Sequence, residues 1–277
     1  MKKLALAVTA VAALSGQALA ADMAVKARFA PQPVVAAISW TGCYVGGGFG
    51  YGLFDQENTG YFDPPGGVFE NVRVTVAQRT RVTETVDTGG RGWFGTVQGG
   101  CDYQFGLGAN QFVIGAQADY DFADIRGNHN PPGTNLWARE KLSEQWAIGG
   151  RIGWLAFPQL LTYFSAGYTE AKFDRQDYTN LIGPPFGIPS GVYTAGRWYK
   201  GWYLGAGDEY ALSILPGLFW KTEYRFSRMD AVTNPIYITA TNLPTIYSED
   251  SRKYVHSVRS ELVYRFNWGG GAVVAKY

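Results

Sequence analysis

The 277-residue chain is predicted to fold as an all-β protein, an eight-stranded antiparallel up-and-down transmembrane β-barrel with four long extracellular loops. Eight segments alternate apolar residues with small or polar ones, as a strand with two different faces does. The connectors alternate between long and short, like the outer loops and periplasmic turns of outer-membrane barrels. Beyond its N-terminal segment the chain has no apolar run long enough for a spanning helix. A spanning part must then be a closed barrel, because lipid leaves no backbone polar group unpaired.

The N-terminus is predicted to be a secretory signal peptide, residues 1–20. Lys2 and Lys3 supply its positive region, residues 4–14 its apolar region, and residues 18–20 (Ala-Leu-Ala) a small-x-small cleavage site. A membrane anchor is the alternative, but the apolar stretch is too short for one. The signal indicates export, which leaves the periplasm and the outer membrane as destinations.

The rest of the chain divides into a periplasmic N-terminal lead, residues 21–39, and the barrel, residues 40–277. Loss of Lys2 and Lys3 from 24 basic residues leaves 22, against 23 acidic residues. A near-neutral chain without a basic tract is unsuited to nucleic acid. Glycine is abundant at 36 residues, and aromatic residues make up 16%. Glycines let barrel strands bend, and aromatic residues form girdles at the membrane interfaces. A soluble β-sandwich, the alternative, seldom carries nine Trp.

The predicted strands share an outward apolar face and an inward face of small, polar or charged residues. They are residues 40–51, 93–105, 111–125, 142–157, 161–174, 198–212, 218–229 and 254–266. The long connectors are residues 52–91, 126–141, 175–197 and 230–253; tight turns include 106–110, 158–159 and 215–217. In the first connector Val72, Val74, Val76, Val82 and Val86 alternate with polar residues. This alternation favours an extension of the second strand beyond the membrane, and an irregular loop is the alternative.

One residue departs from the pattern. Asp208 falls on the predicted lipid face of the sixth strand. A carboxylate on that face is tolerable only close to a membrane interface, so we expect Asp208 near the periplasmic rim.

The inward face carries the predicted functional residues, a network of charges in the lumen. They are Asp102, Asp119, Asp121, Arg151, Glu209, Lys221, Glu223, Arg225, Arg259, Glu261 and Arg265. Eight strands leave a lumen only wide enough for side chains to fill. Buried charges must be paired and hydrogen-bonded, so we predict a salt-bridged plug that makes the barrel rigid. The alternative is a narrow ion path along the same charges.

The two cysteines, Cys43 and Cys101, are predicted to form a disulfide. Export places them in an oxidising compartment. Both fall near the periplasmic rim, on the outward faces of neighbouring strands. Antiparallel neighbours bring Cβ atoms within about 5 Å, close to the roughly 4 Å of a disulfide. The alternative is two small apolar residues packed against lipid.

Signals for catalysis, cofactors and metals are weak. His129 and His256 stand alone, and a lone His of this kind is most often solvated. No pair has metal-ligand spacing. His256 next to Ser257 suggests a lipid hydrolase, but nothing marks the rest of a triad. The glycine-rich residues 46–50 follow no βα pattern and are no nucleotide loop. We therefore expect no enzyme, no cofactor and no metal.

Several strand motifs, in their order and spacing, resemble the small outer-membrane surface antigens of alphaproteobacteria. The motifs are WTGCYVGG at 40–47, GAQADY at 115–120, YLGAG with EYA at 203–211, KTEYR at 221–225, and YRFNWGG with VVAKY at 264–277. The resemblance spans nearly the whole mature chain but only its strands. It implies an eight-stranded outer-membrane barrel, exposed and often immunogenic, with a structural or porin-like role and no known chemistry. The chain departs from the pattern in its long loops and in Cys43, where Phe is commoner.

Together these observations predict an outer-membrane β-barrel with a role in envelope integrity and surface contact. Its expected partners are outer-membrane lipid and lipopolysaccharide, and a loop ligand outside the cell that the sequence does not identify. The chief alternative is a small porin for ions or solutes. A lipid-modifying enzyme of the outer membrane is the third possibility.

Overall fold

The computed structural model describes residues 38–63, 79–131, 133–180 and 187–266. The predicted signal peptide, the lead up to residue 37, Val72, Val74, Val76 and residues 267–277 lie outside this part of the chain. The chain divides into two units, Met1–Ala36 and Ala37–Tyr277. All the elements below belong to the second unit.

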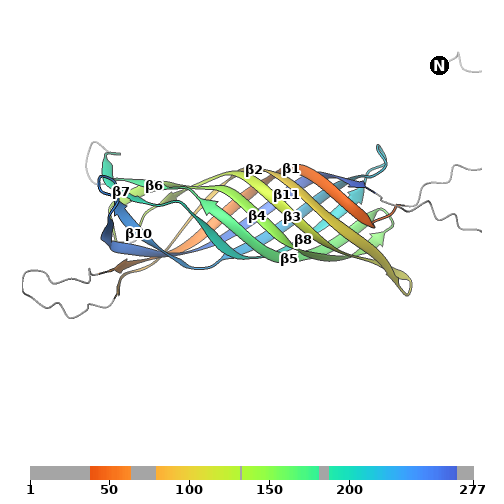
Figure 1. Cartoon of the computed structure of the whole chain (residues 1–277), viewed down its shortest axis with the longest axis horizontal. Helices are drawn as coiled ribbons and strands as arrows, with labels where there is room; N and C mark the ends of the chain where they lie inside the picture. Colours follow the sequence, from red (N-terminus) through yellow and green to blue (C-terminus); the bar gives the residue numbers. More distant parts are fainter. Residues whose placement is uncertain (1–37, 64–78, 132, 181–186, 267–277) are drawn as a thin grey trace, which may run out of the picture. The chain divides into compact units, whose positions relative to one another are not determined.

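Eight antiparallel strands close into a ring, as the sequence predicts. They are β1 (Gly42–Phe62), β2 (Thr80–Leu107), β3 (Asn110–His129), β4 (Leu136–Phe157), β5 (Leu160–Phe173), β8 (Arg197–Ala211), β9 (Leu218–Met229) and β11 (Pro244–Phe266). Each strand pairs with the next in this order, and β1 pairs with β11 to close the barrel (Figure 1). Within the described residues, no helix is long and apolar enough to cross a membrane.

Five of the eight strands, β1, β2, β3, β4 and β11, are longer than predicted, which shortens the long connectors they border. β2 has 28 residues and β11 has 23, whereas about 9–11 residues of tilted strand suffice to cross a bilayer. The predicted strands stopped where the outward residues ceased to be apolar. That rule holds only in lipid, because outside the membrane both faces of a paired strand can be polar. Val82 and Val86 lie on β2, as the predicted extension of that strand requires.

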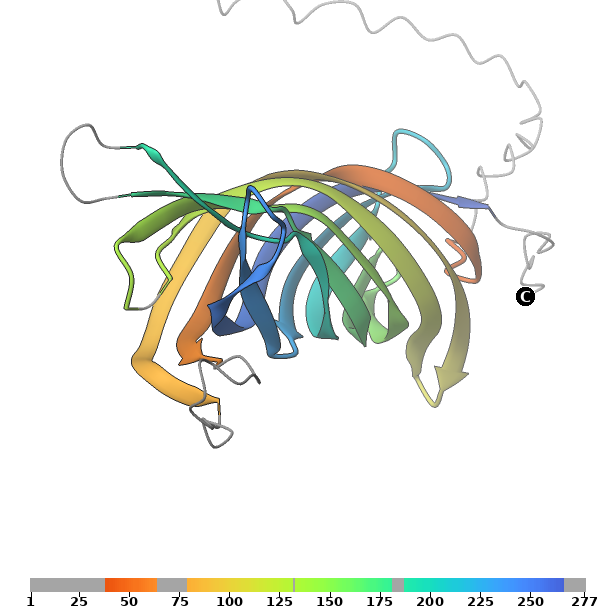
Figure 2. The same cartoon turned by 60° about the vertical axis from the view of Figure 1, so that its left-hand side comes forward.

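Three further strands lie inside the predicted connectors: β6 (Gln176–Asn180), β7 (Pro189–Thr194) and β10 (Val232–Ile238). β6 pairs with β4 and β7, and β10 pairs with β7 and β11. They therefore bridge the sheet from β4 to β11 where β5, β8 and β9 have ended. Figure 2 brings this end of the barrel forward. We call it the outer end, because the short turns between barrel strands lie at the other.

The start of β1 also differs from the prediction. The strand begins at Gly42, and Trp40 is fully buried. The Trp40 backbone N–H donates to Gln104 Oε1 at 3.1 Å, and its indole N–H donates to the Pro158 carbonyl at 3.2 Å. The first turn is also tighter than residues 106–110, because β2 runs to Leu107 and β3 begins at Asn110.

The outward face changes from apolar to charged at one level around the barrel. The first charged outward residue beyond the apolar band of each strand, going toward the outer end, is Asp55, Arg91, Asp124, Glu144, Glu170, Lys200, Arg228 or Arg252. We call this set the outer charged ring. The membrane-spanning segments lie between it and the short turns, where outward side chains such as Phe49, Ile114 and Leu204 are exposed. Asp208 is exposed at the opposite border, close to the end of β8, and accepts a 2.6 Å hydrogen bond from Thr162.

Glycines on the inward face of β1 make room for side chains in the lumen. Added to Gly50, a Cβ would lie 2.2 Å from the Phe94 ring. Added to Gly48, it would lie 2.1 Å from the Ser260 carbonyl oxygen. Neither position accepts a larger residue without movement of the neighbouring strand. This part of the wall is therefore thin, and the space inside it is available to the charged residues described next.

Candidate functional site

The eleven charged residues predicted for the lumen all lie inside the barrel. None is more than 8% exposed. They contact one another in two groups, and we call the whole set the inner network. Alternation along each strand places them, since the residues two positions apart share a face.

The first group lies near the short turns and joins Asp102, Arg151, Glu209 and Arg265. Arg151 donates to both carboxylates, at 2.9 Å to Asp102 Oδ1 and 2.9 Å to Glu209 Oε2. Arg265 donates to the same two residues, at 2.6 Å and 2.7 Å, and also to the Trp40 carbonyl at 3.1 Å. Two guanidinium groups thus balance two carboxylates, and Trp40 closes the group from the turn side.

The second group joins the other seven residues. Arg225 forms a two-pronged pair with Asp119, at 2.8 and 2.9 Å, and contacts Glu223 at 2.8 Å. Arg259 bridges Asp119 and Asp121, at 3.0 Å to each. The Lys221 ammonium lies 3.5 Å from Glu261 and 3.7 Å from Glu223. Every charge in the inner network therefore has at least one partner of opposite sign, as burial requires.

Neutral side chains that the sequence analysis did not select complete this network. Gln98 accepts from Lys221 at 2.6 Å and donates to Glu261 at 2.8 Å. Tyr163 donates to Glu223 at 2.8 Å. The Tyr44 ring lies 4.8 Å from the Arg151 guanidinium and 4.9 Å from that of Arg265. These aromatic contacts fill space between the charges and add cation–π attraction.

An apolar layer lies on the outer side of the inner network. Its buried members are Phe54, Phe94, Ala123, Ile125, Leu142, Ala171, Phe173, Tyr199, Met229 and Val255. Its rings meet edge to face, with Phe54 5.3 Å and Tyr199 5.4 Å from Phe173. Moving a bare ion through such a layer is costly, because nothing there replaces its water.

A second buried polar cluster lies beyond the apolar layer, toward the outer end. We call it the outer cluster and define it as Gln56, His129, Glu140, Glu249 and Lys253, each at most 5% exposed. The prediction that His129 is solvated is wrong. His129 is the last residue of β3 and continues the inward face of Asp119 and Asp121. The same alternation on β11 places Lys253 and Glu249 inside, so strand parity could have found these residues, but a bulge in β4 between Leu142 and Glu144 shifts the parity that would place Glu140.

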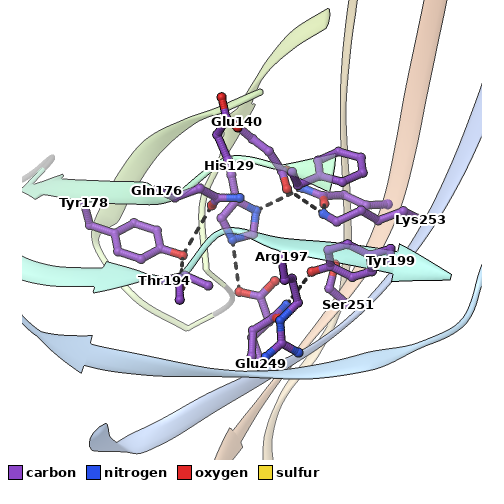
Figure 3. Close-up of a pocket in the computed structure, with 15 residues that line it drawn as sticks. His129, Glu140, Gln176, Tyr178, Thr194, Arg197, Tyr199, Glu249, Ser251 and Lys253 are labelled. Carbon is purple, nitrogen blue, oxygen red and sulfur yellow. Dashed lines mark hydrogen bonds and ion pairs between the residues drawn. The ribbon is translucent and has the colours of Figure 1, made fainter. Parts of the chain in front are cut away.

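The contacts of the outer cluster centre on His129 (Figure 3). Its Nε2 lies 3.0 Å from Glu249 and its Nδ1 lies 3.1 Å from the Gln56 amide nitrogen. Gln56 also contacts Glu140 and Lys253, and Lys253 donates to Glu140. Burial alone lowers the pKa of His129, but the charges of Glu249 and Glu140 outweigh burial and raise the pKa above its usual value. The imidazole therefore gains a proton more readily than in water.

The outer cluster encloses little free space. The volume that a water molecule can enter is about 10 Å³, on the scale of the roughly 10–15 Å³ needed to hold one. Tyr178 of β6 and Thr194 of β7 border it and share a 2.9 Å hydrogen bond. The described residues hold no group of three or more His, Cys, Asp or Glu arranged to bind a metal ion. The outer cluster is thus a packed polar contact.

Cys43 and Cys101 face each other across the β1–β2 pair and are joined by a disulfide. Both lie on the outward face, near the short-turn end of the barrel. His256 and Ser257 are neighbours on β11 and point to opposite faces. Ser257 is buried in the lumen, whereas His256 lies outside and its Nδ1 is 2.8 Å from the Tyr224 hydroxyl. These two side chains therefore do not meet.

Comparison with known proteins finds relatives that are named for the outer membrane. No protein-family model matches the chain. The chain is similar to the 31 kDa outer-membrane immunogenic protein of Brucella melitensis, with 27% identity over 273 residues that cover 96% of this chain and 100% of the relative. The same protein of Brucella suis shows the same identity and coverage. The resemblance seen in the sequence is confirmed, and the chain is an outer-membrane β-barrel.

Similar solved structures include two outer-membrane proteins. OprG from Pseudomonas aeruginosa matches with a TM-score of 0.45 and 8% identity, over 83% of this chain and 100% of that one. Ail, the attachment invasion locus protein of Yersinia pestis, matches with a TM-score of 0.34 and 10% identity, over 81% of this chain and 99% of that one.

Proposed function

We propose that this protein is a structural barrel of the outer membrane, with a sealed lumen and with its outer end as a contact surface. One observation carries the proposal. The lumen holds two buried, charge-paired clusters with an apolar layer between them. A barrel filled in this way is rigid and leaves no open path for transport. Its outward face meets lipid along the membrane and the surroundings of the cell beyond the outer charged ring.

The chief alternative is a small porin that conducts along the inner network. Single-channel recording in planar bilayers separates the two. We expect no discrete openings from the wild-type barrel, because the apolar layer and the paired charges leave no hydrated path. Openings that change their conductance or ion preference in Lys221→Met would place conduction in this lumen and support the porin.

We also propose that the protein is not an enzyme. The separation of His256 and Ser257 onto opposite faces of β11 supports this, because a nucleophile needs its base within hydrogen-bond reach. Mass spectrometry of lipid A from cells with and without the protein tests it. Identical lipid A in both is the expected result. A modification that depends on the protein would favour the lipid-modifying alternative.

The proposed partners are the lipids of the outer membrane, with lipopolysaccharide among them, and an external ligand at the outer end. Support for the lipid partner is the exposed apolar belt and the charges that border it. Support for the external contact is the ordered surface that β6, β7 and β10 build beyond the membrane. The relatives carry the word immunogenic in their name, which fits a surface reachable from outside.

A further inference from the structure

A row of basic residues crosses the outside of the barrel on three neighbouring strands. Arg91 of β2 pairs directly with Arg126 of β3, and Arg126 pairs with Lys141 of β4. Arg139 lies two residues from Lys141 on the same face of β4. Like charges placed directly opposite each other on a sheet are destabilising. The row of basic residues therefore does not stabilise the pairing of these strands.

Two acidic residues, Asp55 and Asp124, lie beside the row. Asp124 lies 2.7 Å from Arg126 and 3.5 Å from Lys141. Neither Arg91 nor Arg139 forms an ion pair or a side-chain hydrogen bond with any residue that the structure describes. Elsewhere in the same region, Lys172, Lys200 and Arg252 each lie beside a carboxylate. The β2–β4 sector therefore holds two cations without a carboxylate partner among the described residues, whereas β9 carries one such cation in the outer charged ring, Arg228.

A hollow of about 430 Å³ lies within this sector. It forms where the pairing of β2 with β3 ends, at Gly90 and Gly127. Arg91, Arg126 and Arg139 line it, against a single carboxylate, Asp55. The hollow is thus large enough for a small anionic group, and its walls supply guanidinium donors that match phosphate in charge and geometry.

The hollow borders the lipid-facing band on the side of the outer end. Trp93, two residues from Arg91 toward the short turns, is 63% exposed, and Phe122 on β3 is 61% exposed. Residues two positions apart on a strand are about 7 Å apart. A molecule with phosphate in the hollow would therefore place its apolar part against Trp93 and Phe122. That combination of phosphate and hydrocarbon at the outer border of the membrane is the chemistry of a phosphorylated outer-leaflet lipid.

We propose that Arg91, Arg126 and Arg139 bind the phosphate of a phosphorylated outer-leaflet lipid on the outer wall of the barrel. This site deepens the proposed lipid contact and rests on it, but it does not depend on whether the lumen conducts. Whether or not bilayer recording detects channel openings, the test of this site is therefore unaffected.

The test is native mass spectrometry of the folded, full-length mature protein with bisphosphorylated lipid A. The variant Arg91→Gln/Arg126→Gln/Arg139→Gln removes the site. The matched control Lys172→Gln/Lys200→Gln/Arg252→Gln removes the same charge from the paired sectors. Heat-modifiable migration on a gel verifies that both variants are folded. We expect the site variant to bind lipid A at least about tenfold more weakly than wild type, since hydrogen bonds to charged groups are lost. The control should stay within about twofold of wild type, because its cations are already paired.

Two further arms identify the ligand. Lipid A stripped of its phosphates should bind wild type at least about tenfold more weakly, by the same loss of charged hydrogen bonds. Inorganic phosphate in excess should not displace the phosphorylated lipid, because the apolar contact adds to its affinity. Equal binding by the site variant and the control would overturn the proposal, as would equal binding of both lipids. Displacement by inorganic phosphate would overturn the lipid as the occupant.

Discussion

The two buried polar clusters of the lumen solve the same problem with different chemistry. The inner network lies within the membrane-spanning segments and pairs carboxylates with arginine and one lysine. The outer cluster lies beyond the apolar layer, in the ring that β6, β7 and β10 help to close, and contains His129. Arginine keeps its charge at any physiological pH, whereas histidine changes charge near neutrality. The difference indicates that the part of the lumen inside the membrane is fixed, while the part outside it can respond to the medium.

The largest effect should come from an unpaired charge in the inner network. Arg265→Met leaves Asp102 and Glu209 to share Arg151, and we expect a loss of about 3–5 kcal/mol in the free energy of unfolding. Lys253→Met in the outer cluster should cost less, about 1–3 kcal/mol, because Glu140 still accepts a hydrogen bond from Gln56. Urea unfolding of the barrel in detergent, followed by gel mobility, measures both. A cost for Lys253→Met equal to that for Arg265→Met would erase the distinction between the clusters.

The next effect concerns the disulfide, which fastens the short-turn end of the barrel near the inner network. Loss of the Cys43–Cys101 bond by Cys43→Ala/Cys101→Ala should lower the free energy of unfolding by about 2–4 kcal/mol, since the bond closes a loop of 58 residues in the unfolded chain. Thiol alkylation of the denatured, unreduced wild type should label no cysteine. Two labelled cysteines per chain would show that the bond is absent.

A smaller effect is expected from pH, because the stabilisation by the outer cluster should depend on the protonation of His129. The pKa of His129 is raised in the folded protein by Glu249 and Glu140 against the opposing effect of burial, and Lys253 and Tyr178 also face this group. The stabilisation from its protonated form is complete below the unfolded pKa of about 6.5 and is lost as the pH rises through the folded pKa.

His129→Gln should therefore destabilise the barrel more at about pH 6 than at about pH 9. Urea unfolding at the two pH values gives the comparison. Ser251→Ala, a neutral change in the same region, serves as the control and should have the same effect at both. A pH-independent cost of His129→Gln would show that its charge does not matter to the fold.

The smallest effect is expected at the exposed outer rim. Arg79 lies 3.0 Å from Asp63 and 2.7 Å from Asp250, all about one third exposed. Arg79→Ala should change the free energy of unfolding by at most about 1 kcal/mol, because solvent and salt screen such pairs. Unfolding at low and at high salt measures the difference. A cost as large as that of Lys253→Met would mean that the rim supports the outer cluster.

The sequence was sufficient for the part of the barrel in lipid and insufficient beyond it. Alternation with an apolar outward face marked all eight strands and put residues such as Asp119 and Arg225 inside. The same alternation continues to His129 and Lys253, but there the outward residues are charged, so an apolar criterion assigned these positions to loops. The pairings of β6, β7 and β10 join segments far apart in the chain, and no local pattern specifies them. Trp40 was predicted to begin the first strand, but it precedes β1 and closes the lumen, and alternation alone does not mark that boundary.

The outer end of the barrel is a surface assembled from separate stretches of chain. β4, β6, β7, β10 and β11 come together there through backbone pairing. An antibody or receptor that recognises this surface must read several of them at once, in the geometry that the sheet imposes. Binders selected against a linear peptide from 176–180 or 232–238 would meet that sequence in a different conformation, with its backbone groups already engaged. Molecules that recognise the intact cell should therefore be selected against the folded barrel.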